Sequence, residues 1–402
     1  MLVVKKFGGS SVADKERIFN VARRCIEDYE KGNDVVVVLS AMGKTTDGLI
    51  AKAHEINPNP PKRELDMLLV TGEQVSVALM AMAMSSLGVP AVSLNAAQVV
   101  MHTSSAYGSA KLKRIDVERI RHELESRRIV IVTGFQGINK YDDFTTLGRG
   151  GSDTTAVALA AALHADVCEI YTDVEGVYTA DPRVVPNARK LAEVSYDEML
   201  EFASLGAKVL HNRSVEMAKK YGVKLVVLSS LTRAGGTIVK EETKVERTLI
   251  SGVAADASVA RISVLGVENK PGITFRVFNL LAKNHINVDI IIQSVTEPGK
   301  KDISFTVAKT DLSDTMDLLR ENRESLTARE IVSEEGVAKL SVIGAGMCSN
   351  PGVAAKMFEA LYSADVNTEM IATSEIRITA LIDERDVKRA MRAVHDAFDL
   401  AD

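Results

Sequence analysis

Two short glycine-containing segments, far apart in the sequence, place cations and hydroxyl groups beside backbone that carries no side chains. The first is Lys6–Ser11 (Lys-Phe-Gly-Gly-Ser-Ser), at the end of the first apolar run, and the second is Leu147–Thr155, before an alanine-rich stretch. Bare amides can approach an anionic oxygen closely, and the cation balances its charge. Each segment therefore suits a phosphate or carboxylate ligand. Their pairing indicates one ligand that bridges them or two ligands that meet between them.

The first segment is expected at a strand-to-helix turn. Leu2–Val4 predicts a strand, and the apolar spacing in Val12–Tyr29 predicts an amphipathic helix. Gly8 and Gly9 would then lie where unpaired amides at the helix start point toward an anion. Lys6, near the strand end, could reach the same place. The alternative is a plain tight turn with a solvated lysine.

The second segment is expected to open a helix over Thr154–Ala165. Ser152 or Asp153 could therefore serve only as an N-cap. Arg149 argues against that reading, because a planar guanidinium placed before a helix start suits a carboxylate ligand.

Composition excludes several classes of protein. The chain has 402 residues, enough for two or three domains, with 46% hydrophobic and 26% charged residues. A net charge of -5 without a basic stripe makes nucleic acid an unexpected partner. Cys25, Cys168 and Cys348 lie far apart, which favours a reducing compartment and a role as core filler.

No targeting, membrane or metal motif is evident. The amino terminus lacks the order of a signal peptide, and we expect no stretch of the eighteen or so apolar residues that a membrane helix needs. The seven histidines show no paired metal-binding spacing. Gly43-Lys44-Thr45 fails as a P-loop because Val38 stands where the motif requires glycine. We expect a cytoplasmic protein without a metal centre of its own.

Residues 1–240 alternate between β-type and helical patterns, which indicates an α/β fold with a largely parallel sheet covered on both faces. The predicted strands, beyond the first, are Val35–Leu39, Ala91–Leu94, Ile129–Thr133, Val167–Thr172 and Lys224–Ser229. The further predicted helices are Pro61–Leu87 with a break near Thr71, Asp116–Ser126, Ala156–Leu163, Tyr196–Ala203 and Gly206–Tyr221. Ligands of such sheets lie beyond the carboxyl ends of the strands. The loops expected there are Lys6–Ser11, Ser40–Thr46 and Thr172–Tyr178.

The remaining third of the chain contains a duplication. Val259–Gly266 matches Val337–Gly344, and Pro271-Gly272 matches Pro351-Gly352. Each copy reads as strand, Pro-Gly turn, helix and strand, followed by a further strand and helix, which predicts two β-α-β-β-α-β units. The pair could be a dimerisation or scaffold module, or a sensor that holds a small molecule at the Pro-Gly turns.

These motifs together resemble those of the aspartokinases. Lys6–Ser11 is similar to the opening signature of that family, and Leu147–Thr155 to its second signature. Tyr171–Arg183 resembles its nucleotide-binding segment, Leu69–Glu73 its helix with a substrate-binding glutamate, and the duplicated tail its tandem ACT domains. The resemblance covers the whole chain, with several motifs in the expected order.

The resemblance implies an amino-acid-kinase three-layer α/β/α sandwich with a mostly parallel sheet, followed by two ferredoxin-like (βαββαβ) ACT domains. The implied boundaries are 1–245 for the catalytic domain, 261–335 for the first ACT domain and 336–402 for the second, which a strand at 249–256 could complete. The implied activity is ATP-dependent phosphorylation of the L-aspartate side chain, the first step toward lysine, threonine, methionine and diaminopimelate. Magnesium would accompany the nucleotide.

The resemblance also assigns roles to individual residues. Catalysis would rest on Lys6, Asp153 and Lys208. The ATP-binding residues would be Lys6, Gly8, Gly9, Ser10, Thr172, Asp173, Tyr178, Asp181, Arg183 and Lys208. The aspartate-binding residues would be Ser40, Thr46, Glu73, Arg149, Ser152 and Asp153. Read without the family, Glu73 could be a helix-surface carboxylate, and Asp173 an ordinary turn residue.

The implied regulation is feedback by lysine, threonine or both, bound between paired ACT units. The candidate effector residues are Asn269, Pro271, Gly272, Ile273, Gln293, Asn367, Ser374 and Glu375. A homodimer or higher oligomer through these domains is expected, and a shorter subunit carrying only the tail stays open. His211-Asn212-Arg213 departs from the His-Pro-Arg of many members, on a helix that we expect to lie far from the site.

Two other functions are compatible with these features. One is a kinase of the same fold that acts on glutamate, acetylglutamate or a nucleotide. The other is an amino-acid sensor without catalysis, although the presence of Lys6, Arg149 and Asp153 argues against it.

Overall fold

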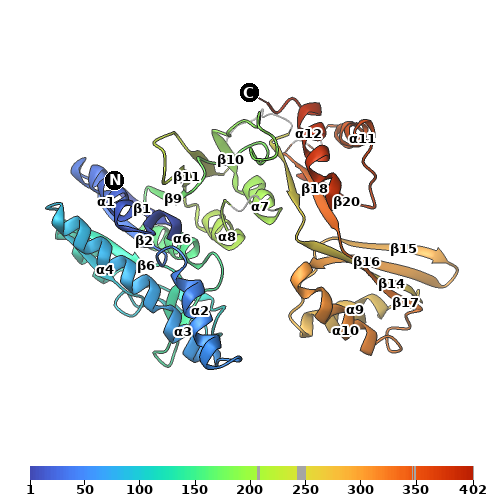
Figure 1. Ribbon diagram of the computed structural model, residues 1–402, viewed down its shortest axis with the longest axis horizontal. Coiled ribbons are helices and arrows are strands. Elements are labelled where there is room, and N and C mark those ends of the chain that lie inside the picture. The colour runs from blue at the N-terminus through green and yellow to red at the C-terminus, as the bar shows by residue number, and fades with distance from the viewer. Residues whose placement is uncertain (206–208, 242–249, 346, 348–349, 402) are drawn as a thin grey trace. The chain divides into compact units, whose positions relative to one another are not determined.

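The computed structural model describes residues 1–205, 209–241, 250–345, 347 and 350–401. The chain forms two compact units, which are described separately (Figure 1). The first unit comprises residues 1–177, 190–204 and 208–244, and the second comprises 178–189, 205–207 and 245–402.

The first unit is built on an eight-stranded sheet in which only the pair β11 and β12 is antiparallel. Continuous Val and Ile runs form its centre because both faces are covered. The strands, in order across the sheet, are β10 (Glu193–Ser195), β12 (Thr237–Lys240), β11 (Leu225–Ser229), β9 (Val167–Thr172), β1 (Leu2–Phe7), β2 (Asp34–Leu39), β6 (Ile129–Thr133) and β3 (Ala91–Leu94).

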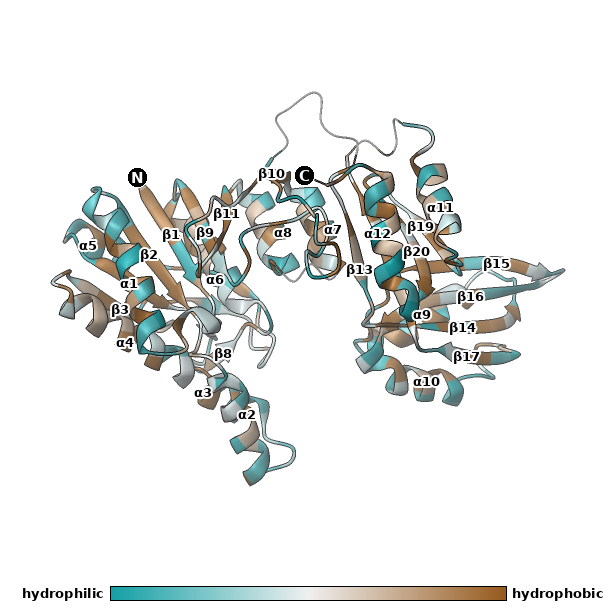
Figure 2. Ribbon diagram, turned by 45° about the horizontal axis from the view of Figure 1, so that its top comes forward, coloured by the Kyte–Doolittle hydropathy of each residue, from teal (hydrophilic) through white to brown (hydrophobic). Residues whose placement is uncertain are grey.

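Helices cover both faces of this sheet and make it the middle of three layers. α1 (Lys15–Glu30) and α4 (Thr71–Ser86) bury apolar side chains against one face. α6 (Gly151–Leu163) packs on the other face, and α8 (Asn212–Tyr221) packs against α6. Figure 2 shows the apolar central strands and the hydrophilic outer side of α1. The other helices are α2 (Thr45–Ile56), α3 (Lys62–Leu69), α5 (Glu118–Glu125) and α7 (Tyr196–Ser204).

Most predicted elements are confirmed, and the exceptions have physical causes. α2 was not predicted, because it buries no residue and so lacks an apolar face. A small sheet was also missed, because its strands are only two or three residues long: β5 (Leu112–Arg114), β4 (His102–Thr103), β7 (Gln136–Ile138) and β8 (Phe144–Thr146). The helix predicted from Gly206 begins only at Asn212 as α8; residues 206–208 lie outside the described part.

One expectation about apolar stretches is wrong. The stretch Lys62–Ser86, which contains α3 and α4, is long and apolar enough to cross a membrane by length and composition alone. Half of its most apolar window is buried inside the unit. α4 supplies Val77, Met80 and Met84 to the core beneath the sheet, which is typical of a core helix in a layered fold.

The second unit contains two four-stranded antiparallel sheets. The first has the order β15-β16-β14-β17, and each strand and helix comes from the first repeat. Its elements are β14 (Val259–Glu268), α9 (Ile273–Lys283), β15 (Ile291–Glu297), β16 (Lys300–Ala308), α10 (Leu312–Glu321) and β17 (Glu330–Glu334). The second sheet has the order β13-β18-β20-β19, from β13 (Gly252–Asp256), β18 (Val337–Ile343), β19 (Met370–Thr373) and β20 (Arg377–Asp383), with helices α11 (Val353–Ser363) and α12 (Val387–Ala397).

β13 precedes both repeats in the sequence but pairs antiparallel with β18 of the second repeat. It therefore occupies the edge that β17 fills in the first sheet. The three-layer sandwich followed by two four-stranded sheets, each with two helices, confirms the predicted fold class. The first repeat has the chain order βαββαβ, whereas the second is completed by β13, as the strand predicted at 249–256 could do. The boundaries at 245, 261 and 335 stay predictions, and residues 178–189 pack in the second unit although they lie within the range 1–245.

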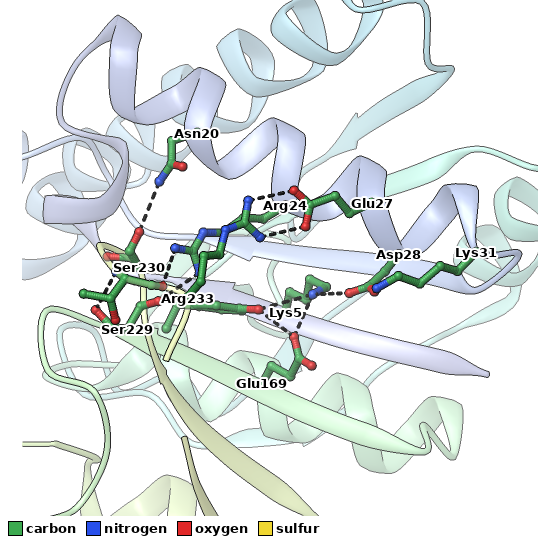
Figure 3. A network of polar contacts seen from close by, with 12 residues as sticks. Lys5, Asn20, Arg24, Glu27, Asp28, Lys31, Glu169, Ser229, Ser230 and Arg233 are labelled. Atoms are coloured by element: carbon green, nitrogen blue, oxygen red, sulfur yellow. Dashed lines mark hydrogen bonds and ion pairs between the residues drawn. The ribbon is translucent and has the colours of Figure 1, made fainter. Parts of the chain in front are cut away.

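Buried polar groups hold β1, β9 and α1 together (Figure 3). Lys5 is only 2% exposed; its Nζ lies 2.6 Å from Asp28 Oδ2 in α1 and 2.7 Å from Glu169 Oε2 in β9. Burial disfavours the ammonium, but the carboxylates of Glu169 and Asp28 outweigh it and raise the pKa of Lys5. Cys25 in α1 and Cys168 in β9 are both buried, which agrees with the prediction that they fill the core. Cys348 lies outside the described residues.

Replacing the buried ammonium should cost more stability than replacing an exposed one that binds the same carboxylate. Lys5→Met leaves Asp28 and Glu169 facing each other and should lower the free energy of unfolding by about 3 kcal/mol. The control is Lys31→Met, because Lys31 Nζ also contacts Asp28, at 2.9 Å, but its side chain is 68% exposed. The control should change the free energy by at most about 0.5 kcal/mol in urea denaturation followed by circular dichroism. Equal effects of the two substitutions would contradict the role of the buried network.

Candidate active site

The first glycine segment leaves the sheet at the carboxyl end of β1. Gly8 follows the strand, and a short 3₁₀ turn over Gly9–Val12 comes before α1. α1 begins at Lys15 and is capped by Asp14, whose side chain accepts a hydrogen bond from the Arg17 amide at 2.9 Å. The predicted direct entry into a helix at Val12 is therefore wrong. The amides of Gly8 and Gly9 belong to the loop and 3₁₀ turn that precede α1 and not to its N-terminus, which Asp14 caps.

Gly9 is required by close packing between two loops. A Cβ at Gly9 would lie 2.6 Å from the carbonyl oxygen of Ala41. The Gly43 amide also donates to the Gly9 carbonyl oxygen at 3.0 Å. The loops that follow β1 and β2 are thereby joined backbone to backbone at the same edge of the sheet.

The Lys6 side chain connects the two glycine segments. Its Nζ lies 2.6 Å from Asp153 Oδ1, and both side chains are 12% exposed. A Cβ at Gly8 would be 3.6 Å from that Nζ, so the ammonium lies directly beside the bare backbone. The alternative of a plain turn with a solvated lysine is therefore wrong. Lys6 is a mostly buried cation between the two predicted anion-binding loops.

The second glycine segment turns sharply into α6. Gly148 and Gly150 have φ angles of 77° and 67°, a left-handed conformation that favours glycine. α6 begins at Gly151 with Gly150 as its N-cap, so Ser152 and Asp153 lie in the first turn and neither is the capping residue. Arg149, between the two left-handed glycines, is exposed and has no hydrogen bond or ion pair within the described part of the chain.

Two polar side chains, the buried Asp66 and the half-buried Arg213, hold this loop from behind, and neither of these contacts was predicted from the sequence. The Arg213 guanidinium donates to the carbonyl oxygens of Leu147 and Ala110, each at 3.0 Å, and burial lowers its pKa. Asp66 accepts hydrogen bonds from the Thr146 amide (2.9 Å) and hydroxyl (2.8 Å). Asp66 stands in no motif, and Arg213 stands in one that was expected to lie far from the site. Their partners are backbone groups or lie far away in sequence.

The expectation that His211-Asn212-Arg213 lies far from the site is wrong. Besides the bond from Arg213 to Leu147, the His211 ring packs against Gly150, where a Cβ would come within 2.2 Å of the ring. The start of α8 thus packs directly against the loop that carries Arg149.

The residues predicted to bind the amino acid include a buried acid. Ser40 Oγ lies 3.0 Å from Ser152 Oγ, and Thr46 lies half-buried in the first turn of α2. Glu73 is only 2% exposed, so the alternative of a helix-surface carboxylate is wrong. Its Oε1 accepts from the Ala41 amide at 3.1 Å, while Oε2 is buried without a partner among the described residues. Burial raises the pKa of Glu73 to about 7.

The residues predicted to bind nucleotide fall into both units. Thr172 ends β9 and its hydroxyl accepts from the Val174 amide at 2.9 Å; Asp173 and Ser10 are exposed. The other described ones are Tyr178, Asp181 and Arg183, which lie in the second unit. Lys208 lies outside the described residues.

Segment 178–189 belongs to the second unit because its apolar side chains fill that unit's core. Ala180 and Val185 are buried together with Val253 of β13 and Leu340 of β18. The Val253 amide donates to the Thr179 carbonyl oxygen at 2.7 Å. Within this segment, the Arg183 guanidinium binds Asp181 at 2.8 Å and lowers the pKa of that carboxyl.

The predicted effector residues lie at the Pro-Gly turn before α9, in strand β15, and in the segments that follow α11 and β19. The Pro-Gly turns of the two repeats match in conformation. Gly272 (φ 96°) is the N-cap of α9, and Gly352 (φ 106°) is the N-cap of α11. In the first repeat, Gln293 Oε1 accepts from the Thr274 hydroxyl at 2.9 Å, next to the buried Ile273. The other candidates are Asn269, Pro271, Asn367, Ser374 and Glu375, all exposed.

No group of three or more His, Cys, Asp or Glu side chains that could hold a metal ion occurs among the residues that the structure describes.

Comparisons with known proteins agree with this architecture. The amino acid kinase family model matches residues 1–229, and ACT domain models match residues 260–324 and 340–398. The chain is 52% identical over 401 residues to the aspartokinase of Bacillus sp. (strain MGA3), covering 100% of this chain and 98% of that protein. It is also similar to the structure of E. coli aspartokinase III in complex with aspartate and ADP (R-state), with 29% identity and a TM-score of 0.85. The complex of the same E. coli protein with lysine and aspartate (T-state) has 28% identity and a TM-score of 0.78. Each match covers 99% of both chains.

The raised pKa of Glu73 should make the stability of the unit depend on pH. The unfolded chain releases this proton near its ordinary value of 4.5, whereas the folded chain holds it up to about pH 7. The free energy of unfolding should therefore fall as pH rises from about 4.5 to about 7. Glu73→Gln should remove this fall, because the amide has no proton to release. The free energy of unfolding of the variant, relative to the original chain, should increase by about 3 kcal/mol between pH 4.5 and pH 8 in urea denaturation. The exposed Glu55→Gln is the control, and a difference for Glu73→Gln that stays constant with pH would refute the burial effect.

Proposed function

The chain belongs to the amino acid kinase family and, within it, to the aspartokinases, and we propose that it transfers the γ-phosphoryl group of ATP to the side-chain carboxylate of L-aspartate. The product is 4-phospho-L-aspartate. The observation that carries this assignment is the contact of Lys6 Nζ with Asp153, which joins both glycine segments around one mostly buried cation. An E. coli relative whose structure contains aspartate and ADP supports the same pair of ligands.

The chemistry requires positioning and charge neutralisation. A carboxylate is already ionised at neutral pH, so the nucleophile needs no general base. The barrier arises from bringing this anion to the phosphorus of an anionic triphosphate. The Lys6 ammonium beside the amides of Gly8 and Gly9 supplies positive charge at that point, in a site shielded from water where each charge acts more strongly.

The order of strands separates the two substrates. On one side of β1 in the sheet lie β9 and β11, whose carboxyl ends meet at the predicted nucleotide-binding segment after Thr172. On the other side lie β2 and β6, whose carboxyl ends lie near Ser40 and Thr133. We place ATP on the first side, with Gly8, Gly9, Ser10, Thr172 and Asp173; the family resemblance adds Tyr178, Asp181, Arg183 and Lys208. We place aspartate on the second side, with Ser40, Thr46, Glu73, Arg149, Ser152 and Asp153. The reacting groups then meet at Lys6.

Arg149 and Glu73 match the two charged ends of the amino acid. The exposed guanidinium of Arg149 has all its donors available for a bidentate bond to the α-carboxylate. Glu73 offers a buried carboxylate oxygen without a partner for the α-ammonium, which would favour the ionised form of the acid. Asp153 orients Lys6 and the ammonium.

Magnesium accompanies ATP in this proposal. It would be held mainly by phosphate and water oxygens, since no group of metal-binding side chains occurs among the described residues. Its chemical contribution is to neutralise charge on the phosphates. Asp153 and the loop backbone position the groups around it.

The reaction can be tested by trapping the acyl phosphate with hydroxylamine. The chain with ATP and magnesium should form the hydroxamate with aspartate, and Lys6→Met should lower kcat at least about 1000-fold, because a transition-state charge loses its partner. The control is Lys15→Met, since Lys15 is an exposed lysine at the start of α1. A hydroxamate with glutamate or acetylglutamate but not with aspartate would assign another acceptor. No product with any acceptor, alongside binding of lysine or threonine in calorimetry, would indicate a sensor.

The second unit is proposed to provide feedback control by lysine, threonine or both. A lysine complex of an E. coli relative supports this, as do the matching Pro-Gly turns. Inhibition requires that the effector bind an inactive arrangement more tightly than an active one. We place the enzyme at the first step toward lysine, threonine, methionine and diaminopimelate, in the cytoplasm. We further propose that the chain forms a homodimer or larger oligomer through the ACT domains. A shorter subunit that contains only the ACT domains could take part in this assembly.

Steady-state aspartate phosphorylation with lysine and threonine, alone and combined, tests the regulation. Gln293→Ala should raise the half-inhibitory concentration of the effector at least about tenfold, because the side chain beside the α9 start loses its polar contact. Lys388→Ala, an exposed substitution on α12, should leave that concentration unchanged. The absence of inhibition by either amino acid at millimolar concentration would exclude this form of control.

A further inference from the structure

One face of α1 binds the turn that follows β11. Asn20, Arg24 and Glu27 are spaced four and three residues apart, so they lie on the same side of the helix. Asn20 Nδ2 donates to the Ser230 carbonyl oxygen at 3.1 Å, and Glu27 forms two 2.7 Å bonds with the Arg233 guanidinium. Figure 3 shows these side chains reaching the turn from α1.

Arg24 is the buried member of this group. It is 5% exposed, and its guanidinium carbon lies 5.6 Å from the centre of the Tyr171 ring. It donates to the carbonyl oxygens of Ser229 at 3.0 Å and Thr232 at 2.6 Å. These carbonyls stand at the two ends of the turn, so one planar group fixes both ends. A lysine ammonium has no such fork.

The same turn holds the segment that follows β9. The Ser230 amide donates to the Thr172 carbonyl oxygen at 2.8 Å. The Thr232 hydroxyl donates to Glu175 Oε1 at 2.9 Å. The segment Thr172–Glu175 is thus bound to the turn at both of its ends, and the turn is bound to Arg24.

We propose that Arg24 is a positioning residue for the nucleotide: through the 229–232 turn it sets the position of Thr172–Glu175 at the carboxyl end of β9. This inference rests on the proposed function, which places ATP at that segment. Arg24 touches neither substrate in this scheme. Its substitution should therefore weaken nucleotide binding selectively, because the aspartate residues lie on the other side of β1.

The test is a comparison of Michaelis constants among variants of the full chain. Arg24→Met should raise KM for ATP and the calorimetric Kd for ADP about tenfold, with KM for aspartate changed less than twofold. Arg24→Lys keeps the charge and can reach one carbonyl, so its increase should be about threefold. Arg23→Met is the matched control, because it removes an exposed arginine next to Arg24 on the same helix; it should change neither constant.

A second variant separates positioning from general destabilisation. Thr232→Val removes the bond to Glu175 and leaves the backbone bonds of Arg24 in place; it should raise KM for ATP about threefold. It also carries the test if Arg24→Met does not fold, as judged by circular dichroism. Unchanged nucleotide constants in Arg24→Lys and Thr232→Val, or equal increases for both substrates, would overturn the role of Arg24. If the original chain forms no aspartyl hydroxamate, the proposed function fails, and the Kd for ADP still decides on Arg24.

Discussion

The ion pair between Lys6 and Asp153 is the interaction on which the chemistry proposed for the first unit depends. The ammonium is mostly withdrawn from water and lies beside the glycine backbone of one loop while it binds the first turn of α6. A cation in such a place is stabilised by a carboxylate, and the same field attracts anionic oxygen atoms. The parallel sheet makes this possible because β1 and α6 bring residues from positions 6 and 153 to one edge.

The loops at this edge are held from behind by polar side chains of helices. Asp66 and Arg213 bind the backbone before Arg149, and Arg24 binds the turn after β11. Buried loop carbonyls and amides need partners, and side chains on rigid helices can supply them without adding flexible chain. The same bonds restrict where Arg149 and Thr172 can lie. Accurate placement matters here, since the proposed reaction relies on geometry and charge and not on a reactive side chain.

The second unit contains part of the segment that the family resemblance assigns to nucleotide. Residues 178–189 follow β9 directly along the chain, yet Ala180 and Val185 belong to the core of the second repeat. Thr179 also bonds to the buried His395 at 3.0 Å and to the Leu400 carbonyl oxygen at 3.1 Å. A ligand that changes the packing of this repeat would therefore act on a segment that is continuous with the end of β9.

The sequence by itself determined the elements and the chemistry of the motifs. Val35–Leu39 and Ile129–Thr133 could be predicted as buried strands because Val and Ile runs suit a sheet covered on both faces. Lys6, Arg149 and Asp153 could be chosen because glycines, cations and hydroxyls adjoin within each segment. The full-length resemblance added Glu73, and only the structure placed that acid in the interior, where burial raises its pKa.

Only the tertiary structure decided which distant groups meet. The bonds of Asp66, Arg213 and Arg24 go largely to backbone atoms, which every residue carries, so no residue type at the other end marks them in the sequence. α2 escaped prediction because it has no buried face, and β13 joins the second repeat although the first repeat lies between them. Local patterns report burial and turn chemistry, whereas strand pairing and loop support depend on contacts between residues that the chain brings together only when it folds.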